Sequence, residues 1–466
     1  MATGPPDATV VGAGPNGLAA AVELARSGRR VLVVEAAEEI GGGTRTEELT
    51  LPGFLHDVCS AIHPSGVASP FFRRIDLAVD WIQPPLPLAH PLDGGRAVGL
   101  HGSVRDTAAQ FGEDESSYVD LMGPLVETFD AVIEEVLGPL TLVPEHLGPL
   151  ARFAIMGGLS ASTVAARFDS DEARALFGGL AAHAIAPFDA LATAGVGLML
   201  AAVGHALGWP LARGGSQSIA AALAEQLRSH GGSIETGRLV ETVDELDGDL
   251  FLLDVMPPAA YQMAKDRLSL SALWRLPRWN PGPGVFKVDW ALGGPIPWAD
   301  PVSPHTATVH LGGTWDEVKE AEDEVFKGRH PERPFVILAQ QSLFDPTRAP
   351  EGQHTAWGYC HVPNGSTVDM TAAIEAQIER FAPGFTDLVL ERHTRNSLEY
   401  ESYNPNFVGG DIGGGKYGLR KVLKLGSKRP YTLGAGVYLC SAAAPPGAGV
   451  HGMCGYYAAR AALDSD

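Results

Sequence analysis

The stretch ATVVGAGPNGLAAAVELARSGRRVLVVEA, residues 8–36, constrains the fold more than any other part of the chain. It begins with a short β-branched run and continues with the glycine pattern Gly12-x-Gly14-x-x-Gly17, a segment of good helix formers, and a second apolar run with Glu35 at its end. Strand, glycine turn, helix, strand and terminal acid in this order are typical of a dinucleotide-binding unit in a parallel sheet. The sequence therefore predicts an α/β protein with a Rossmann-like domain.

Each residue type in this unit has a chemical reason. Gly12 and Gly14 allow a tight turn and a close approach of the backbone to a pyrophosphate, and Gly17 lets the helix pack closely on the strand. The free N–H groups at the helix N-terminus attract phosphate charge, and Glu35 can accept hydrogen bonds from a ribose diol. We expect the following residues of this unit to bind the cofactor: Gly12, Gly14, Pro15, Asn16, Gly17, Glu35 and Ala36.

A second glycine pattern, Gly447-x-Gly449-x-x-Gly452, lies near the C-terminus. It also follows a strand-like run, residues 436–444, so its spacing raises the question of a second dinucleotide site. Only 14 residues follow Gly452, and their pattern indicates one helix. Since a complete unit needs another strand and a ribose-binding acid, we expect this motif to complete the first domain from the far end of the chain.

The charge balance and the cysteines limit the classes of partner. The chain has 466 residues, with 34 Lys and Arg against 55 Asp and Glu, so its net charge is −21. Such a surface repels nucleic acid and anionic lipid headgroups, and we expect neither as a general partner. The four cysteines show no CxxC pair and no metal-ligand spacing. We therefore expect no metal site, and free thiols in a reducing compartment, the cytoplasm.

Neither a secretory signal nor a membrane span is expected. The N-terminal MATGPPDATVV has no basic segment before an apolar run. The apolar stretch at residues 190–207 is long enough to be mistaken for a span, but Pro187 and Asp189 precede it and His205 lies inside it. Because a spanning helix needs apolar flanks and interfacial anchors, we expect a buried helix here.

Three further segments carry a family resemblance. EAAEEIGGGTRTEELTLPGFLHDVCSAIHP, residues 35–64, is similar to the segment that continues the first unit in flavoproteins with two dinucleotide-binding domains. Residues 209–243 are similar to the middle FAD segment of such proteins, and VYLCSAAAPPGAGVHGMCGYYAARAAL is similar to their final motif. The chain thus resembles the phytoene-desaturase-like FAD-dependent oxidoreductases, and within them the branch of pyridine nucleotide-disulfide oxidoreductase domain 2.

This resemblance implies a discontinuous FAD domain, of the type with two dinucleotide-binding domains, and a substrate domain of helices and mixed antiparallel sheet. The FAD domain would comprise residues 1–75, 208–260 and 425–466, with a helical part of the substrate domain at 76–207 and a sheet part at 261–424. In the sheet part, strand-like runs separated by turn signals predict an antiparallel sheet that forms the floor of a substrate cavity. These runs are residues 285–292, 306–313, 334–342 and 354–362.

The resemblance also implies further site residues. Those expected to bind FAD are Gly42, Gly43, Arg45, Thr46, Val240, Ser441, Gly449, Val450 and His451. In the family, Val240 would lie opposite the adenine, and the N-terminus of the last helix, near Val450, would supply positive potential to flavin N1 and C2=O. His63, in a loop that the family passes near the isoalloxazine, is the candidate catalytic proton acceptor. The alternatives are that His63 only orders its loop and that His451 only caps the helix.

Two groups of polar residues are further candidates. The first lies on the predicted floor strands, where alternation gives each side chain an even chance of facing the cavity: Lys287, Asp289, Tyr359 and His361. The second lies in a glycine-rich segment that resembles the family's return into the FAD domain: Asn404, Asn406 and Asp411.

The combined expectation is an FAD-dependent oxidoreductase that dehydrogenates (desaturates) or isomerises a hydrophobic small molecule by hydride transfer to flavin N5. Oxygen or a quinone would accept the electrons, because the sequence holds no second complete nucleotide unit. Two alternatives stay open: an amine oxidase-like flavoenzyme with an aromatic cage drawn from Tyr400, Tyr403 and Tyr456, and a non-catalytic lipid- or prenyl-binding protein on the same fold. The sequence leaves open whether the chain forms a homo-oligomer.

Overall fold

The first of two large sheets unites three distant parts of the chain. The computed structural model describes residues 4–138, 145–418 and 429–465. The six strands of this sheet, in the order β16-β17-β10-β1-β2-β9, are β1 (Ala8–Val11), β2 (Val31–Val34), β9 (Ser233–Glu235), β10 (Leu250–Leu253), β16 (Thr432–Gly434) and β17 (Val437–Leu439). All run parallel except β16. The predicted fold class, with a discontinuous Rossmann-like domain, is confirmed.

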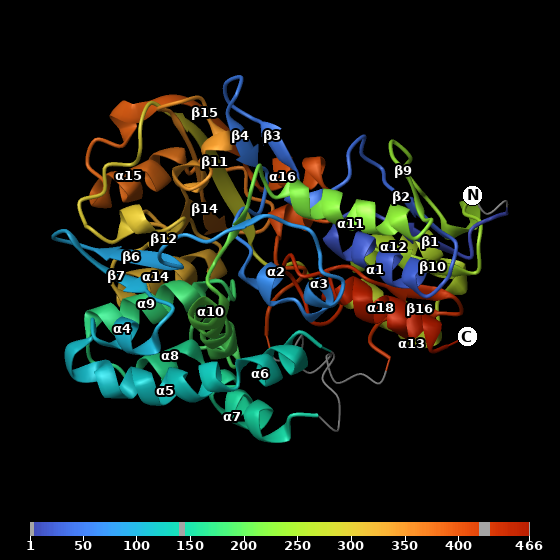
Figure 1. Ribbon diagram of the computed structural model, residues 1–466, viewed down its shortest axis with the longest axis horizontal. Helices are drawn as coiled ribbons and strands as arrows, with labels where there is room; N and C mark the ends of the chain where they lie inside the picture. The colour runs from blue at the N-terminus through green and yellow to red at the C-terminus, as the bar shows by residue number, and fades with distance from the viewer. Residues whose placement is uncertain (1–3, 139–144, 419–428, 466) are drawn as a thin grey trace.

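Helices pack closely on this sheet (Figure 1). They are α1 (Pro15–Arg26), α11 (Gln217–Ser229), α12 (Pro257–Ala264), α13 (Leu270–Arg275) and α18 (Met453–Leu463). α1 lies between α11 and α18 and contacts both. A side chain on Gly455 would place its Cβ 1.8 Å from the carbonyl oxygen of Asn16, so α18 needs a glycine where it meets the start of α1. Every residue of β1 and β10 is buried, as expected for parallel strands covered on both faces.

The second sheet has seven strands in the order β15-β11-β14-β13-β12-β6-β7. They are β6 (Leu88–Leu92), β7 (Arg96–Leu100), β11 (Gly284–Leu292), β12 (Thr308–Leu311), β13 (Val336–Ala339), β14 (His354–Val362) and β15 (Val389–Arg395). The pairs β11–β14, β14–β13 and β13–β12 are antiparallel, which confirms the predicted four-strand sheet. β15 extends this sheet at one edge and the β6–β7 hairpin at the other.

The two faces of the second sheet have different partners. On β14, Ala356 and Cys360 pack into a core that includes residues of α15 (Thr371–Phe381). Trp357 and Tyr359 alternate with them and therefore project from the opposite face, where they line a large cavity. This second face is called the sheet floor below.

Helices from the middle of the chain complete the substrate domain (Figure 1). They are α4 (Val104–Ala108), α5 (Glu115–Glu127), α6 (Phe129–Val136), α7 (Leu147–Gly157), α8 (Ala161–Ala165), α9 (Asp171–Ala182), α10 (Thr193–Leu207) and α14 (Trp315–Phe326). The apolar stretch expected to be a buried helix forms α10, in which Ala194 and Leu198 are fully buried. Among the described residues, no helix is both long and apolar enough to cross a membrane.

The exact domain boundaries stay predictions. Within residues 76–207, the part expected to be helical, β6 and β7 join the second sheet, so this part contributes strands as well as helices. The boundary between residues 424 and 425 lies outside the described residues.

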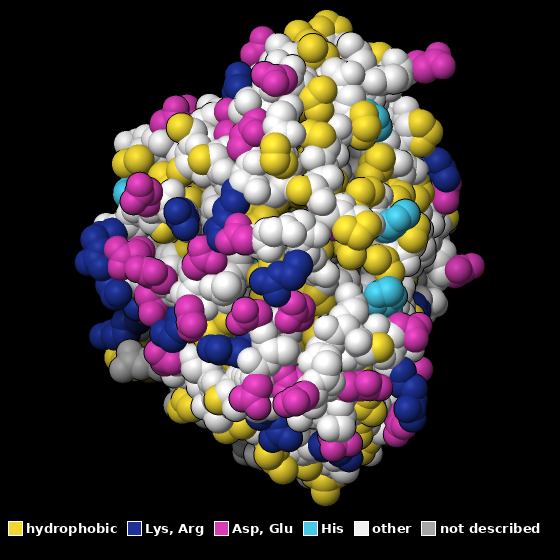
Figure 2. Space-filling view, turned by 90° about the vertical axis from the view of Figure 1, so that its left-hand side faces the viewer, with side chains coloured by type: hydrophobic (Ala, Val, Ile, Leu, Met, Phe, Trp, Pro, Cys, Tyr) yellow, Lys and Arg dark blue, Asp and Glu magenta, His cyan; other side chains and the backbone are white. Residues whose placement is uncertain are grey.

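Acidic and basic side chains are interspersed on the outer face of the substrate domain (Figure 2). Two ion pairs tie α15 to the second sheet. The Arg380 guanidinium donates to Asp93, 2.7 Å away in the β6–β7 turn, and Arg392 of β15 donates to Glu375 at 2.5 Å. Because these pairs are solvent-exposed, each contributes roughly 0–1 kcal/mol to the free energy of unfolding.

Candidate active site

A cavity of about 1810 Å³ lies between the two sheets. Its walls come from the loop after β1, the end of β2, the 42–45 and 59–65 segments, α7, α10, the sheet floor, and the segments at 404–418 and 442–450. One side is therefore built from the dinucleotide-binding unit and the other from the substrate domain. Such an arrangement can hold a cofactor and a second molecule in contact.

The first glycine motif opens toward this cavity. Gly12 has a φ of +103°, a conformation that favours glycine, and its N–H donates to the carbonyl oxygen of Val34 at 2.8 Å. Gly14 and Pro15 at the start of α1 line the cavity. Gly17 serves packing instead, because a Cβ there would lie 2.0 Å from the carbonyl oxygen of Gly12.

Two polar groups beside this motif are available to a ligand. Asn16 lines the cavity, and its side-chain oxygen is buried and has no hydrogen-bond partner among the described residues. The Glu35 carboxylate accepts hydrogen bonds from the N–H groups of Ala13 at 2.7 Å and Ala37 at 3.0 Å. These bonds fix the carboxylate at the end of β2, where Glu35 and Ala36 line the cavity and one carboxylate oxygen lies 3.5 Å from the Arg45 guanidinium.

Asp254, which the sequence analysis missed, lies against the glycine motif. It follows β10, and its Oδ2 accepts a hydrogen bond from the N–H of Gly17 at 2.9 Å. The same oxygen lies 3.0 Å from the position that a Cβ on Gly14 would occupy. Burial, and then the charge of Glu35, raise the pKa of Asp254 to about 7. One signal could have found it: an acid placed directly after an apolar strand of a parallel sheet.

The 42–46 loop lies beside the first glycine motif. Gly42 approaches Gly14 so closely that a Cβ on Gly42 would lie 3.2 Å from the Cα of Gly14. Gly43 and Arg45 also line the cavity, and the Arg45 guanidinium donates to the carbonyl oxygen of Glu39 at 2.7 Å. Thr46 does not line the cavity, since its hydroxyl donates to the Asp57 carboxylate at 2.8 Å.

The second glycine motif reaches the same cavity as the first. Gly447 and Gly449 have φ values of +121° and +141°, and both line the cavity together with Val450. His451 is buried behind them, and its Nδ1 accepts the N–H of Met453, which begins α18. Burial lowers the pKa of His451 to about 4, so the ring is neutral near pH 7.

The structure brings most of the predicted site residues to this one cavity. Those that line it are Gly12, Gly14, Pro15, Asn16, Glu35, Ala36, Gly42, Gly43, Arg45, His63, Val240, Gly449 and Val450. Those that do not are Gly17, Thr46, Ser441 and His451. A role for these four in cofactor binding stays a prediction: Gly17, Thr46 and His451 hydrogen-bond to neighbouring segments, and the buried Ser441 hydroxyl has no partner among the described residues.

His63 lines the cavity but is not an open base. Its Nε2 lies 2.8 Å from the Ser216 hydroxyl, and its Nδ1 lies 3.4 Å from the Ser60 hydroxyl. Burial lowers the pKa of His63 to about 4. A role as proton acceptor therefore stays a prediction, and it requires one of the serine contacts to open.

The four candidates on the second sheet all lie on the sheet floor, at different depths. Tyr359 lines the cavity, whereas Lys287 and Asp289 are buried beneath it as an ion pair, and Lys287 also donates to the carbonyl oxygen of Asp57 at 3.0 Å. His361 is buried, and its Nδ1 lies 2.8 Å from a Glu322 carboxylate oxygen.

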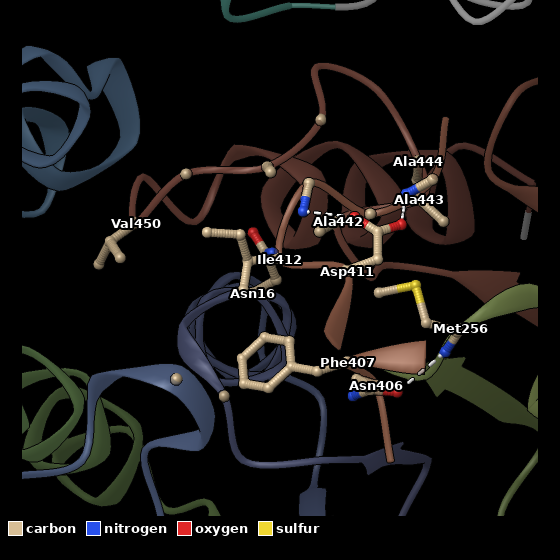
Figure 3. A pocket seen from close by; sticks show the side chains of 18 of the residues that line it. Asn16, Met256, Asn406, Phe407, Asp411, Ile412, Ala442, Ala443, Ala444 and Val450 are labelled. Atoms are coloured by element: carbon tan, nitrogen blue, oxygen red, sulfur yellow. Dashed lines mark hydrogen bonds between the residues drawn. The ribbon is translucent and has the colours of Figure 1, made fainter. Parts of the chain in front are cut away.

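The polar residues of the glycine-rich segment shape one wall of the cavity (Figure 3). Asn406 accepts the N–H of Met256 at 3.0 Å and donates to the carbonyl oxygen of Asp254 at 2.9 Å, which fixes the chain after β10. The Asp411 carboxylate accepts three backbone N–H groups, from Gly282, Gly413 and Gly415, at 2.7–2.8 Å. Both residues therefore organise the backbone around the cavity, and Asn404 lines it beside them.

The three tyrosines considered for an aromatic cage do not form one. Tyr403 lines the cavity and donates its hydroxyl to Glu47 at 3.0 Å. Tyr400 is buried and donates to the carbonyl oxygen of Val58 at 3.1 Å, and Tyr456 stacks on Phe71 with ring centroids 5.2 Å apart. Only Tyr403 of the three reaches the cavity.

Comparisons with known proteins agree with this geometry. Residues 10–75 match the family model of NAD(P)-binding Rossmann-like domains. The chain is 24% identical to the rat pyridine nucleotide-disulfide oxidoreductase domain-containing protein 2, over 97% of this chain and 92% of the relative. It superposes on an oxidoreductase from Methanosarcina mazei with a TM-score of 0.67 at 17% identity, covering 98% and 99% of the two chains. For wild-type putrescine oxidase bound to putrescine the TM-score is 0.62 at 18% identity, with 99% and 98% covered.

The fold and the sequence similarity together define the class of this protein, which is an FAD-type oxidoreductase. The likeness to solved structures adds the fold alone. Within that class the chain is a homologue of pyridine nucleotide-disulfide oxidoreductase domain-containing protein 2, as its motifs predicted.

Proposed function

We propose that this protein is an FAD-dependent dehydrogenase or isomerase of a hydrophobic small molecule. The observation that carries the proposal is the continuous cavity, which has the dinucleotide-binding unit on one side and an aromatic and aliphatic wall on the other. Trp209, Trp357, Ile337 and Leu200 belong to that second wall. A mainly apolar wall facing a redox cofactor suits an uncharged organic substrate.

The residues around the glycine motifs fit FAD. The N–H groups at the start of α1 are suited to donate to the pyrophosphate, the unpartnered Asn16 oxygen can accept from a water molecule bound there, and Glu35 is suited to accept from the ribose diol. Gly447 leaves open space where a side chain would meet nothing within 4 Å. The N-terminus of α18 would place positive potential beside the flavin. When bound, FAD would supply an acceptor for the hydride that leaves a substrate carbon.

The chain's own residues would hold the substrate against the cofactor and exclude water. His63 is the proposed proton acceptor, and its serine partners fix the ring orientation. We further propose that oxygen or a quinone removes the electrons, because we recognise one complete nucleotide unit. We place the protein in the cytoplasm, on the basis of its scattered thiols.

Amine oxidation is the second candidate, since putrescine oxidase shares the fold. The carboxylates that line the cavity in the described residues are Glu35, Asp254 and Asp411; all three accept hydrogen bonds from backbone N–H groups, and none belongs to the sheet floor. This leaves no free carboxylate on the sheet floor to hold an ammonium group. The geometry therefore favours an uncharged substrate over an amine.

A visible absorption spectrum of the purified protein tests the central proposal. Flavin bands are expected, and chromatography of the heat-released cofactor should identify FAD. An apoprotein that stays colourless after incubation with FAD would refute the proposal and would favour a lipid-binding role. Anaerobic mixing with panels of terpenoid hydrocarbons, terpenoid ketones and primary amines would then separate the candidates, because a substrate bleaches the flavin bands.

A further inference from the structure

Two buried polar groups line the cavity from the sheet floor and have no partner among the described residues. The Thr308 hydroxyl oxygen and the Trp357 indole nitrogen are each buried, and neither has a hydrogen-bond partner in the described part of the chain. Thr308 is 2% exposed and Trp357 is 4% exposed, and both residues line the cavity. A buried donor left unpaired costs about 1–3 kcal/mol, so native proteins seldom retain one without a use for it.

Three other tryptophans of the chain show how Trp357 differs. The indole nitrogen of Trp290 donates to Glu375 at 2.8 Å, that of Trp298 donates to Gln340 at 3.0 Å, and that of Trp209 donates to the carbonyl oxygen of Leu200 at 3.2 Å. Each of these indoles is satisfied within the protein. Trp357 therefore has a donor that is open to a ligand.

The strand register places the two groups around one recess. Thr308 of β12 pairs with Ala339 of β13, and Ala339 pairs with Trp357 of β14, so the three residues form one row across the sheet floor. Strands lie about 4.8 Å apart, so roughly 10 Å separates the outer two backbones, with only the methyl group of Ala339 between them. The next row places Ile337 beside Tyr359, whose ring stacks on Trp357 with centroids 5.7 Å apart. We call this space the Ala339 recess.

No charged side chain lines the Ala339 recess in the described part of the chain, and the Lys287 ammonium lies beneath it, 5.3 Å from the centroid of the Trp357 ring. His183 lines the cavity nearby and bonds to His310 at 3.0 Å, and burial lowers the pKa of His183 to about 3. Lys287 and Asp289 lie beneath the floor as a pair and do not line the cavity. The cationic side chains that do line it come from other segments: Arg45, Arg238, Arg275, Arg278 and Lys416. Neither an ammonium nor a carboxylate group would find a counter-charge in the recess itself.

We infer that the Ala339 recess is a specificity site for a neutral oxygen acceptor, such as a carbonyl oxygen, on an otherwise apolar substrate. The Trp357 N–H and the Thr308 O–H donate to that oxygen, and the Trp357 and Tyr359 rings cover the carbon skeleton beside it. The inference rests on the proposed function, because it names the substrate class of the same cavity. It adds that a plain hydrocarbon leaves two donors unpaired and binds more weakly than its oxygenated counterpart.

Carvone and limonene provide a matched pair of probes, because they share one carbon skeleton and differ by a ketone. Binding to the purified holoprotein is measured by equilibrium dialysis, which does not depend on the flavin. The variants are Trp357→Phe, which keeps a ring, and Thr308→Val, which keeps the shape. Thr355→Val is the control, since the Thr355 hydroxyl is also buried and unpartnered but its residue does not line the cavity.

The parent should bind carvone more tightly than limonene. Trp357→Phe and Thr308→Val should each weaken carvone binding roughly 2- to 13-fold, the range for the net contribution of one hydrogen bond, and leave limonene binding unchanged. Thr355→Val should alter neither. Thr308→Val should also keep or raise the Tm, because it removes an unpartnered group, so a loss of carvone binding cannot be assigned to unfolding.

A parent that does not prefer carvone overturns the inference, as does an equal loss for both probes or an equal loss in Thr355→Val. These outcomes are distinct from failure of the proposed function. A colourless protein that still discriminates the two probes refutes the flavin assignment and leaves the recess in place. A yellow protein without discrimination refutes the recess alone.

Discussion

Replacing Asp254 by Asn should make the protein more stable above neutral pH. The Asp254 carboxylate is buried against the first glycine motif, where it accepts the N–H of Gly17. The charged group that faces Asp254 across this site is Glu35. The buried thiol of Cys440 also lies nearby, and burial together with the charge of Asp254 raises the pKa of that thiol. Asn keeps an oxygen that can accept the Gly17 N–H and removes the charge.

The size of this stabilisation follows from the shift in the pKa of Asp254. Burial and Glu35 raise the pKa of Asp254 from the ordinary 3.8 to about 7. The folded state therefore holds a proton that the unfolded state has released, and stability falls as the pH rises from about 4 to about 7. A shift of one pKa unit corresponds to about 1.4 kcal/mol. Above pH 7, ionisation of Asp254 therefore lowers the free energy of unfolding by on the order of 4 kcal/mol. The Asn variant should be free of this cost, and the two proteins should converge near pH 4.

Urea unfolding of the apoprotein at several pH values between 4.5 and 8 measures this difference. The variant's gain over the parent should grow with pH and level off above pH 7. Asp254→Ala removes both the charge and the hydrogen-bond acceptor, whereas Asp254→Asn removes only the charge. The difference between the two variants therefore measures the contribution of the hydrogen bond. A difference between Asn variant and parent that is constant across this range would show that Asp254 does not titrate there, and the reasoning would be wrong. The same variant should bind FAD more tightly at pH 8, since the pyrophosphate would no longer meet a negative carboxylate.

Three further predictions concern the cofactor. Gly14→Val should abolish the yellow colour and retain most of the fold, because φ at Gly14 is −74° and valine tolerates it; full flavin content, measured by absorbance, would contradict this. Anaerobic NADPH should leave the flavin bands largely oxidised over minutes, whereas rapid bleaching would reveal a second nucleotide site. Gly449→Val should lower the flavin potential by on the order of tens of millivolts, or release FAD. A redox titration at matched flavin occupancy measures this, and an unchanged potential with full occupancy would mean that the motif does not touch the flavin.

Local patterns were sufficient for the elements whose determinants are local. The β-branched run before Gly12 predicted β1, and the glycines with the helix formers after them predicted α1. The four strand-like runs of the second sheet were also found, because alternation and turn residues lie within each run. α10 was predicted to be a buried helix from its flanking residues and from His205 inside it.

Facing and register could not be predicted in this way. Which side of a strand meets the cavity depends on partners far along the chain: Thr308 and Trp357 share a row only because β13 pairs with both β12 and β14. The same limit applies to Thr46 and His451, whose neighbours in the sequence line the cavity while they themselves are bonded behind it. The β6–β7 hairpin was missed as part of the second sheet, since it joins β12 across more than two hundred residues of chain.

The two glycine motifs share one cavity because of strand order. β10 lies between β1 and β17, and all three strands run parallel, so their carboxyl ends meet at one edge of the sheet. β1 delivers the first glycine turn to that edge, β10 delivers Asp254, and β17 leads to Gly447 and Gly449. A second dinucleotide would need a second edge of this kind with its own acid. The described strands provide one such edge, and the carboxyl group at its centre, that of Asp254, is therefore placed to sense the charge of whatever both motifs bind.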